Sequence, residues 1–365
     1  MAIDTLAHLK ELSAASGLSA YEKPVREIIR AAWEPLTTEI HVDRLGSLWA
    51  TKAGTAEVLS KTRRPKIMLA AHMDAIGLMV TKVEGEFLRV TQVGGIDVRV
   101  MPSQLVSVHS NGAAPQDLPG VVAQPPAFLL PLDHREGVTP LGELLVDVGL
   151  PAETVRSLVR VGDLISFAEP PRELQNGTLA AKSLDNRASV AALTLCLEEL
   201  QNRPHIWDVV AVATVQEEVG LRGAITTAFA LQPDLAVAID VTFGSASSLP
   251  GFRDFSHRTS AVGGGPALSL GPNIHPALHA AFVTTAERIE CPYSIDALAQ
   301  HSGTDAFGIQ VAREGIPTMV IGIPLRNMHS PIELLAVKDV TRTGRLLAEF
   351  IAGLSLDFMS TLTYE

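Results

Sequence analysis

From residue 178 onward, continuous apolar runs alternate with segments in which apolar residues recur at helical spacing. The apolar runs predict strands at 208–215, 234–241 and 317–324. The amphipathic segments predict helices at 186–201, 221–232, 275–289, 304–314 and 337–353. Strands that are apolar at every position and separated by helices are typical of a mostly parallel sheet buried on both faces. We therefore expect an α/β fold in which helices and sheet form three layers.

A different pattern separates the beginning of the chain from this region. Residues 4–16 and 22–36 predict two helices, and 66–74 is an apolar run that belongs with the other buried strands. Between 76 and 168, short β-type runs are broken by Gly, Pro and Asn, with one helical segment predicted at 140–150. This pattern of short, interrupted strands predicts a small β-rich domain, PDZ-like or barrel-like, at residues 76–168. It is inserted into a larger domain made of residues 1–75 and 169–365.

Composition narrows the class of protein. The chain has 365 residues, 47% of them hydrophobic and 19% charged, which is typical of a folded protein with a large core. A formal net charge of −11 disfavours binding to nucleic acid or to an anionic membrane surface. There are only two cysteines, the N-terminus does not resemble a signal peptide, and no run of 18 apolar residues occurs. We expect a cytoplasmic protein without a membrane span.

Polar side chains gather where the predicted strands end. The apolar run at 66–71 leads to His72 and Asp74, and the run at 208–215 leads to Glu217 and Glu218. Other polar residues occupy comparable positions: Asp240 at a strand end, His329 after 317–324, and Asp185 where a loop enters a helix. Ligands of open α/β sheets bind beyond the carboxyl ends of the strands, so these side chains are expected to converge.

Each of these residues has an ordinary explanation when it is taken alone. Asp185 suits a helix N-cap, Glu218 suits the surface, and His329 suits an exposed loop. The remaining histidines are interpreted as ordinary residues. Taken together, two histidines and three carboxylates suit a pair of divalent ions, with Zn²⁺ first and Co²⁺ or Mn²⁺ as alternatives.

Two cations held close together need a bridging anion between them. We assign the bridge to Asp185, one cation to His72 and Asp240, and the other to Glu218 and His329. Asp74 is placed to orient the imidazole two residues before it. Glu217 remains free to act as a general base toward the water that the cations activate.

Several motifs resemble one known family. They are "AHMDAIG", "KSLDNRASVAAL", "TVQEEVGLRGA", "AIDVT", "SGTDAFGIQVAREGIPT" and "IGIPLRNMHSPIE", in that order. The sequence resembles the TET-type dinuclear metallo-aminopeptidases, which are glutamyl-, leucyl- or lysyl-aminopeptidase-like and include proteins that carry the older label endoglucanase. The resemblance covers nearly the whole chain, including the β-rich insert.

The resemblance implies a hydrolase that removes N-terminal residues from short peptides. It matches His72, Asp185, Glu218, Asp240 and His329 to metal ligands, Glu217 to the general base and Asp74 to the residue that orients the first histidine. It also implies dimers built through the insert and a tetrahedral dodecamer.

Two segments depart from the family's pattern. Asn327 stands where an aromatic residue is usual, and 242–251 is rich in serine and uncharged. The neutral segment and Phe243 favour substrates with neutral aliphatic side chains. Thr304 and Asp305 match a family motif, but a helix cap and a first-turn acid explain them equally simply.

Two other functions stay open at this point. The metals could serve a different amidohydrolase or a carboxypeptidase-like enzyme of the wider di-zinc group. Alternatively, they could only stabilise a shell-forming or peptide-binding protein. A free Glu217 favours an enzyme, because a structural metal site has no use for an unliganded carboxylate.

Overall fold

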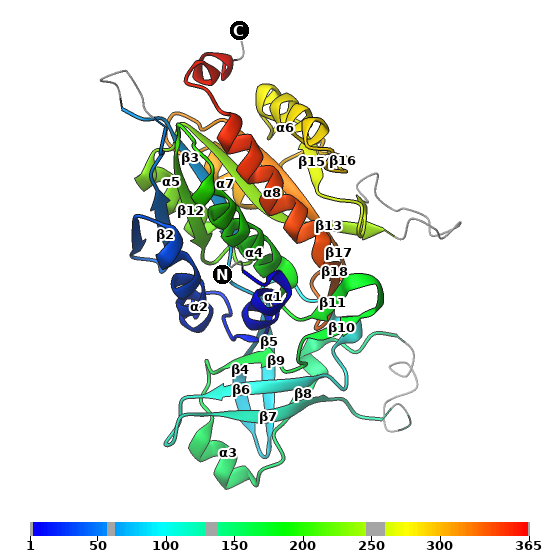
Figure 1. The fold of residues 1–365 in the computed structure, drawn as a ribbon. Helices are drawn as coiled ribbons and strands as arrows, with labels where there is room; N and C mark the ends of the chain where they lie inside the picture. Colours follow the sequence, from blue (N-terminus) through cyan, green and yellow to red (C-terminus); the bar gives the residue numbers. More distant parts are fainter. Residues whose placement is uncertain (1–2, 57–62, 127, 129–136, 246–259, 364–365) are drawn as a thin grey trace.

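A computed structural model describes residues 3–56, 63–126, 128, 137–245 and 260–363. The chain forms a large sheet covered by helices and, beside it, a small β-barrel (Figure 1). A mixed α/β fold with a β-rich part is thereby confirmed. The serine-rich segment 242–251 continues past residue 245 into a part of the chain outside the described residues.

The large sheet has 12 strands, and nine of them follow the order β1-β2-β12-β3-β13-β17-β18-β11-β10. Their bounds are β1 Glu39–Val42, β2 Leu48–Lys52, β12 Asp208–Thr214, β3 Lys66–His72, β13 Leu235–Ser245, β17 Thr318–Arg326, β18 Glu333–Ala336, β11 Thr178–Ala181 and β10 Arg172–Leu174. Three short strands complete the sheet: β14 Ser260–Ala261, β15 Ala267–Leu270 and β16 Ser294–Ala297.

The centre of this sheet is parallel, as are the short pairs β13–β14 and β15–β16. Strands β12, β3, β13 and β17 run in the same direction, whereas β1, β2, β18, β11 and β10 pair antiparallel with their neighbours. The expectation of parallel pairing therefore holds for the four central strands, whose sequences are continuous apolar runs. The outer strands are short and partly exposed, so they lack the apolar signal from which parallel pairing was predicted.

Helices cover both faces of the sheet. Their bounds are α1 Thr5–Ala14, α2 Lys23–Trp33, α4 Leu184–Glu199, α5 Arg222–Leu231, α6 Pro276–Arg288, α7 Asp305–Gln310 and α8 Val337–Gly353. Alternate residues of β3 show the two faces: Ile67 and Leu69 pack in the core with α4 and α8, and Met68 and Ala70 pack with α5 and α7. Figure 1 shows α4 and α8 in front of the sheet and α5 and α7 behind it.

The barrel closes in the order β4-β5-β8-β7-β6-β9 and has a core of its own. Its strands are β4 Gly77–Glu84, β5 Phe87–Val93, β6 Leu105–Ser110, β7 Gln116–Ala123, β8 Leu145–Asp147 and β9 Leu164–Phe167, and α3 Ala152–Leu158 lies between β8 and β9. Barrel closure removes free sheet edges, which allows so small a unit to bury a continuous core.

One predicted helix is wrong. Residues 140–150 form a single 3₁₀ turn, Leu141–Glu143, followed by barrel strand β8. Val146 is buried in the barrel core, and β8 pairs with β5 and β7. The spacing of apolar residues in this segment fits a short strand as well as a helix. Pairing with neighbouring strands therefore determines which of the two forms. Among the described residues, no helix combines the length and apolar character needed to cross a lipid bilayer.

Candidate metal centre

The predicted site residues meet at one end of the parallel strands. His72 is the last residue of β3, Asp185 lies in the first turn of α4, and His329 lies between β17 and β18. Asp240 differs from the expectation, because β13 continues five residues beyond it and pairs with β17 as far as Phe243. Its side chain therefore projects from within a strand rather than from a strand end.

Asp185 occupies the middle of the cluster. Its Oδ1 lies 3.1 Å from Nε2 of His72, and its Oδ2 lies 3.5 Å from Nε2 of His329. Nε2 of His72 is also 3.8 Å from a carboxylate oxygen of Asp240, and Nε2 of His329 is 3.8 Å from a carboxylate oxygen of Glu218. Each oxygen of this one buried carboxylate thus faces a different imidazole.

These distances divide the side chains into sets that could each hold a metal ion. One set is His72, Asp185 and Asp240, and another is Asp185, Glu218 and His329; in each, the ligand atoms lie within 4.8 Å of one another. A third set, His72, Glu217 and Glu218, meets the same limit. The first two sets correspond to the two cation sites expected from the sequence, with Asp185 common to both.

The two adjacent glutamates lie in a turn rather than at the end of an extended strand. Strand β12 ends at Thr214, and Gln216 adopts a left-handed conformation with φ of 57°. The backbone N–H groups of Glu217 and Glu218 both donate to the carboxylate of Asp74, at 3.0 and 3.2 Å. This turn, held by one carboxylate, presents both acidic side chains to the cluster.

Asp74 has more partners than its predicted role requires. In addition to the two backbone N–H groups, its Oδ2 accepts a hydrogen bond from the hydroxyl of Ser19 at 2.6 Å. Nδ1 of His72 lies 3.2 Å from the backbone carbonyl oxygen of Asp74 and 3.5 Å from its carboxylate. Asp74 is fully buried, so these contacts stabilise a charge that would otherwise be costly.

Burial shapes the electrostatics of the cluster. It raises the pKa of Glu217 to about 9 and the pKa of Asp240 to about 8, against partial opposition from His72. Burial and the charge of Asp185 raise the pKa of Glu218 well above its ordinary value. Burial alone would lower the pKa of His72, but the nearby carboxylates raise it. Glu217, Glu218 and Asp240 therefore hold protons at neutral pH unless another positive charge replaces those protons. Asp185 differs, because burial is outweighed by hydrogen bonds from the two histidines, which lower its pKa.

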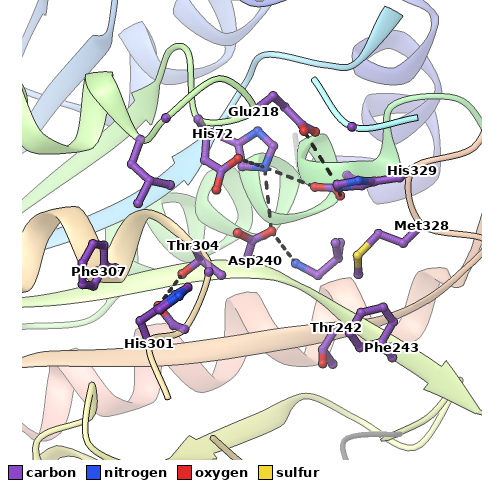
Figure 2. Close-up of a pocket in the computed structure, with 18 of the residues that line it drawn as sticks. His72, Glu218, Asp240, Thr242, Phe243, His301, Thr304, Phe307, Met328 and His329 are labelled. Atoms are coloured by element: carbon purple, nitrogen blue, oxygen red, sulfur yellow. Dashed lines mark hydrogen bonds and ion pairs between the residues drawn. The ribbon is translucent and has the colours of Figure 1, made fainter. Parts of the chain in front are cut away.

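A cavity of about 700 Å³ opens over the cluster. One end carries the histidines and acids, and the remaining wall is largely apolar (Figure 2). Its apolar side chains are Leu221, Ile225, Val241, Phe243, Phe307 and Met328. His301, which the sequence alone marked as ordinary, lies in this wall with its ring 5.3 Å from that of Phe307.

Two supporting residues were not identified from the sequence, and a third, Asp305, has a contact beyond its expected role. Ser19 and Glu333 contact the cluster through hydrogen bonds, and both are buried. Asp305 is the first residue of α7 and follows the N-cap Thr304, as expected, but it is also buried and accepts a hydrogen bond from Thr214 beside His72. The local sequence carries no signal for these roles, because the partners are distant along the chain.

Comparison with known proteins identifies the family. The M42 glutamyl aminopeptidase family matches residues 47–346. The chain belongs to this family. A lysyl aminopeptidase of Pyrococcus furiosus is 32% identical over 355 residues, which cover 96% of this chain and 98% of the relative.

Solved structures agree with the M42 assignment. A TET aminopeptidase from a marine-sediment archaeon of the Thaumarchaeota is 30% identical, with a TM-score of 0.89 and coverage of 99% of this chain and 100% of that one. The TET1 peptidase of Pyrococcus horikoshii, which assembles into a tetrahedron or a large octahedral shell, is 27% identical with a TM-score of 0.80, and the match covers 96% and 100% of the two chains. The resemblance to TET-type peptidases is thereby confirmed, and the M42 family supports a peptide hydrolase.

Proposed function

We propose that this M42 protein is a metal-dependent aminopeptidase that removes N-terminal residues from short peptides. The observation that carries the proposal is the placement of Asp185, whose two carboxylate oxygens face different histidines. A structural metal site needs one closed set of ligands, whereas two of the ligand sets in this cluster share one carboxylate. The cluster also opens into a cavity large enough for a peptide residue.

The residues present fit two divalent cations. His72, Asp240 and one oxygen of Asp185 would hold the first, and Glu218, His329 and the other oxygen of Asp185 would hold the second. Imidazole and carboxylate ligands suit Zn²⁺, with Co²⁺ and Mn²⁺ as alternatives. Such cations supply Lewis acidity, which makes water a nucleophile at neutral pH.

Glu217 is the proposed general base. It lines the cavity, and its carboxylate lies 3.9 Å from Nε2 of His72 without belonging to either proposed cation set. It would take a proton from the attacking water and deliver it to the leaving amine, a role worth ~10²–10⁴-fold in rate. The high pKa of Glu217 falls once positive charge binds nearby, which leaves the carboxylate ionised for this role. Asp74 fixes the turn that carries it.

The proposed site also favours a free amino terminus, because Glu217 together with the cations would give the free substrate amine a recognition point. We would compare Leu-Gly-Gly with its N-acetylated form, using zinc-loaded and chelator-treated protein. Hydrolysis of the free peptide alone, lost on metal removal, supports the proposal. Equal hydrolysis of both peptides would indicate a broader amidohydrolase or a carboxypeptidase-like enzyme. Absence of hydrolysis by protein with bound zinc would indicate a peptide-binding or shell-forming protein.

The cavity wall favours neutral aliphatic N-terminal residues. Among the described residues, its only ionisable side chains are those of the cluster and His301. Burying an acidic or basic substrate side chain against Phe243, Phe307 and Met328 would leave that charge unpaired. Leucine and methionine p-nitroanilides should therefore show a higher kcat/KM than those of glutamate and lysine. Faster cleavage of the glutamate substrate would contradict this preference.

The barrel is proposed to mediate assembly. We assign residues 76–168 to a dimerisation domain and residues 1–75 and 169–365 to the catalytic domain. The shells formed by the TET1 peptidase of Pyrococcus horikoshii support a homo-oligomer, and we propose dimers that build a tetrahedral dodecamer. Two free cysteines, one of them buried, suit a reducing compartment, and we propose a cytoplasmic location.

A further inference from the structure

One buried carboxylate contacts the backbone of two cluster residues at once. Glu333 is the first residue of β18 and only 1% exposed. Its Oε2 accepts a hydrogen bond from the backbone N–H of Asp185 at 2.9 Å, and its Oε1 accepts one from the backbone N–H of His329 at 3.2 Å. The side chains of these two partners face each other across 3.5 Å.

Strand pairing explains how Glu333 reaches both partners. It lies opposite Ala181 at the end of β11, four residues before Asp185. It also closes the loop that begins after β17 and carries His329. In that loop, Asn327 and His329 adopt left-handed conformations, with φ of 58° and 61°. Such conformations persist in residues other than glycine only where surrounding contacts hold them.

We propose that Glu333 is a positioning residue that sets the spacing between Asp185 and His329, and so builds the second cation site. The proposal rests on the proposed function, since it assumes that Asp185, Glu218 and His329 bind a cation. Glu333 holds two ligands of the second site, Asp185 and His329, but only Asp185 of the first. The other two ligands of the first site, His72 and Asp240, are residues of paired strands in the sheet centre. Loss of Glu333 should therefore affect the two cation sites unequally.

The chain offers a matched control. Asp339, at the start of α8, is also fully buried, and its carboxylate accepts hydrogen bonds from the backbone N–H groups of Gly263 and Gly265 at 2.6 and 2.9 Å. It takes no part in the sets that could hold a metal. Neutralising Asp339 thus weakens a similar pair of backbone contacts, together with its ion pair to Arg342 at 3.4 Å, without touching the cluster.

Calorimetric titration of the metal-free full chain with Zn²⁺ would test the proposal. Glu333→Gln keeps the side-chain size but turns an amide N–H₂ toward one of the two backbone N–H groups. We expect two binding steps in the unsubstituted protein. The variant should keep the first step and bind the second ion about 10–100-fold more weakly, as is usual for residues that orient metal ligands. Asp339→Asn should keep both steps, even if its Tm falls.

Three results would overturn the proposal. In the first, Glu333→Gln binds both ions like the unsubstituted protein. In the second, Glu333→Gln and Asp339→Asn lose affinity at both steps equally, which would show a general structural role. In the third, the unsubstituted protein binds fewer than two ions, which would refute the bimetallic function itself. If Glu333→Gln does not fold, Glu333→Asp, which keeps the charge on a shorter side chain, should show the same selective loss.

Discussion

The two carboxylate oxygens of Asp185 face different imidazoles, Oδ1 toward His72 and Oδ2 toward His329. A helix N-cap, the ordinary explanation for an aspartate at this position, would direct an oxygen to a backbone N–H in the first turn of the helix. Here Asp185 is itself held by Glu333 through its own backbone N–H. The residue-level geometry thus favours a bridging ligand over a cap.

The neighbouring glutamates should give opposite results when each is neutralised. Glu217→Gln should keep both cations and lose ~10²–10⁴-fold in kcat, because only proton transfer is removed. Glu218→Gln should lose cation occupancy, because it removes a ligand. Metal content and the rate of Leu-p-nitroanilide hydrolysis, measured on the same samples, separate the two effects. A Glu217→Gln protein with unchanged kcat would refute the role of that residue.

The sequence carried enough information to find the histidines and acids of the cluster, but not the residues that support them from behind. Four of the five predicted ligands, His72, Asp185, Glu218 and His329, stand next to strand or helix boundaries, which apolar periodicity predicts. Asp240 was found because the apolar run ends there, although strand β13 continues beyond it. Whether the five bind metal stays a prediction. Ser19 and Glu333 reach the cluster through contacts between distant segments, and no local pattern distinguishes a serine or glutamate that makes such contacts from one that does not.

Among the secondary-structure elements, the start of α5 fixes the position of the turn that carries Glu217 and Glu218. The backbone N–H of Gly223 donates to the carbonyl oxygen of Val215 at 3.0 Å. A Cβ added at Gly223 would lie 2.6 Å from backbone atoms of Val215 and 2.8 Å from the hydroxyl oxygen of Ser47. Helix and strand end therefore approach each other more closely than any side chain at this position allows.

Gly223→Ala should destabilise the protein by about 1–3 kcal/mol, the usual cost of overpacking. It should also weaken cation binding, because the displaced turn carries Glu218. Gly142→Ala is the control, since a Cβ there meets no atom within 4 Å. Urea unfolding of both variants measures the difference, and a Gly223→Ala protein as stable as the control would show that the turn can shift freely.

The sequence predicts helices and strands correctly where a segment is buried along its length. It fails where pairing with neighbouring strands determines whether a segment is a helix or a strand. The buried strands β3, β12 and β17 and the long helix α8 lie within a residue or two of their expected ranges. Residues 140–150 were assigned to a helix because their apolar spacing fits one, but contacts with β5 and β7 make part of them a strand. Short segments of the barrel lack the length that would distinguish a strand from a helix.

For the whole molecule, the buried acids couple stability to pH and to metal. Asp240 and Glu217 ionise near pH 4 when unfolded but near pH 8 and 9 in the metal-free fold, so the folded state binds more protons in between. Their contribution to stability therefore falls as pH rises through this window. Lys182 acts oppositely, because burial lowers its pKa to about 7, but it belongs to none of the sets that could hold a metal.

The gain in Tm on adding zinc should consequently be larger at pH 8 than at pH 6. Zinc at pH 6 must displace protons from the acids, and each displaced proton changes the zinc affinity about tenfold per pH unit. Thermal unfolding of chelated and zinc-loaded samples at both pH values separates the effect of the acids from the titration of Lys182, because Lys182 is present in both samples. An equal gain at the two pH values would mean that the acids are not titrated by metal binding.

The barrel, with a core separate from that of the sheet, gives the molecule a second unit free to form contacts between subunits. Light scattering should report an oligomer. If assembly and catalysis reside in different units, the oligomer should keep its mass when the metal is removed. A monomer at micromolar concentration would contradict the proposed dimerisation.

The central claim, a bimetallic centre bridged by Asp185, is tested most directly by anomalous scattering from crystals grown with zinc. We expect two peaks per chain, one beside His72 and Asp240 and the other beside Glu218 and His329, with an oxygen of Asp185 contacting each. A single peak, or two peaks of which Asp185 contacts only one, would contradict the account.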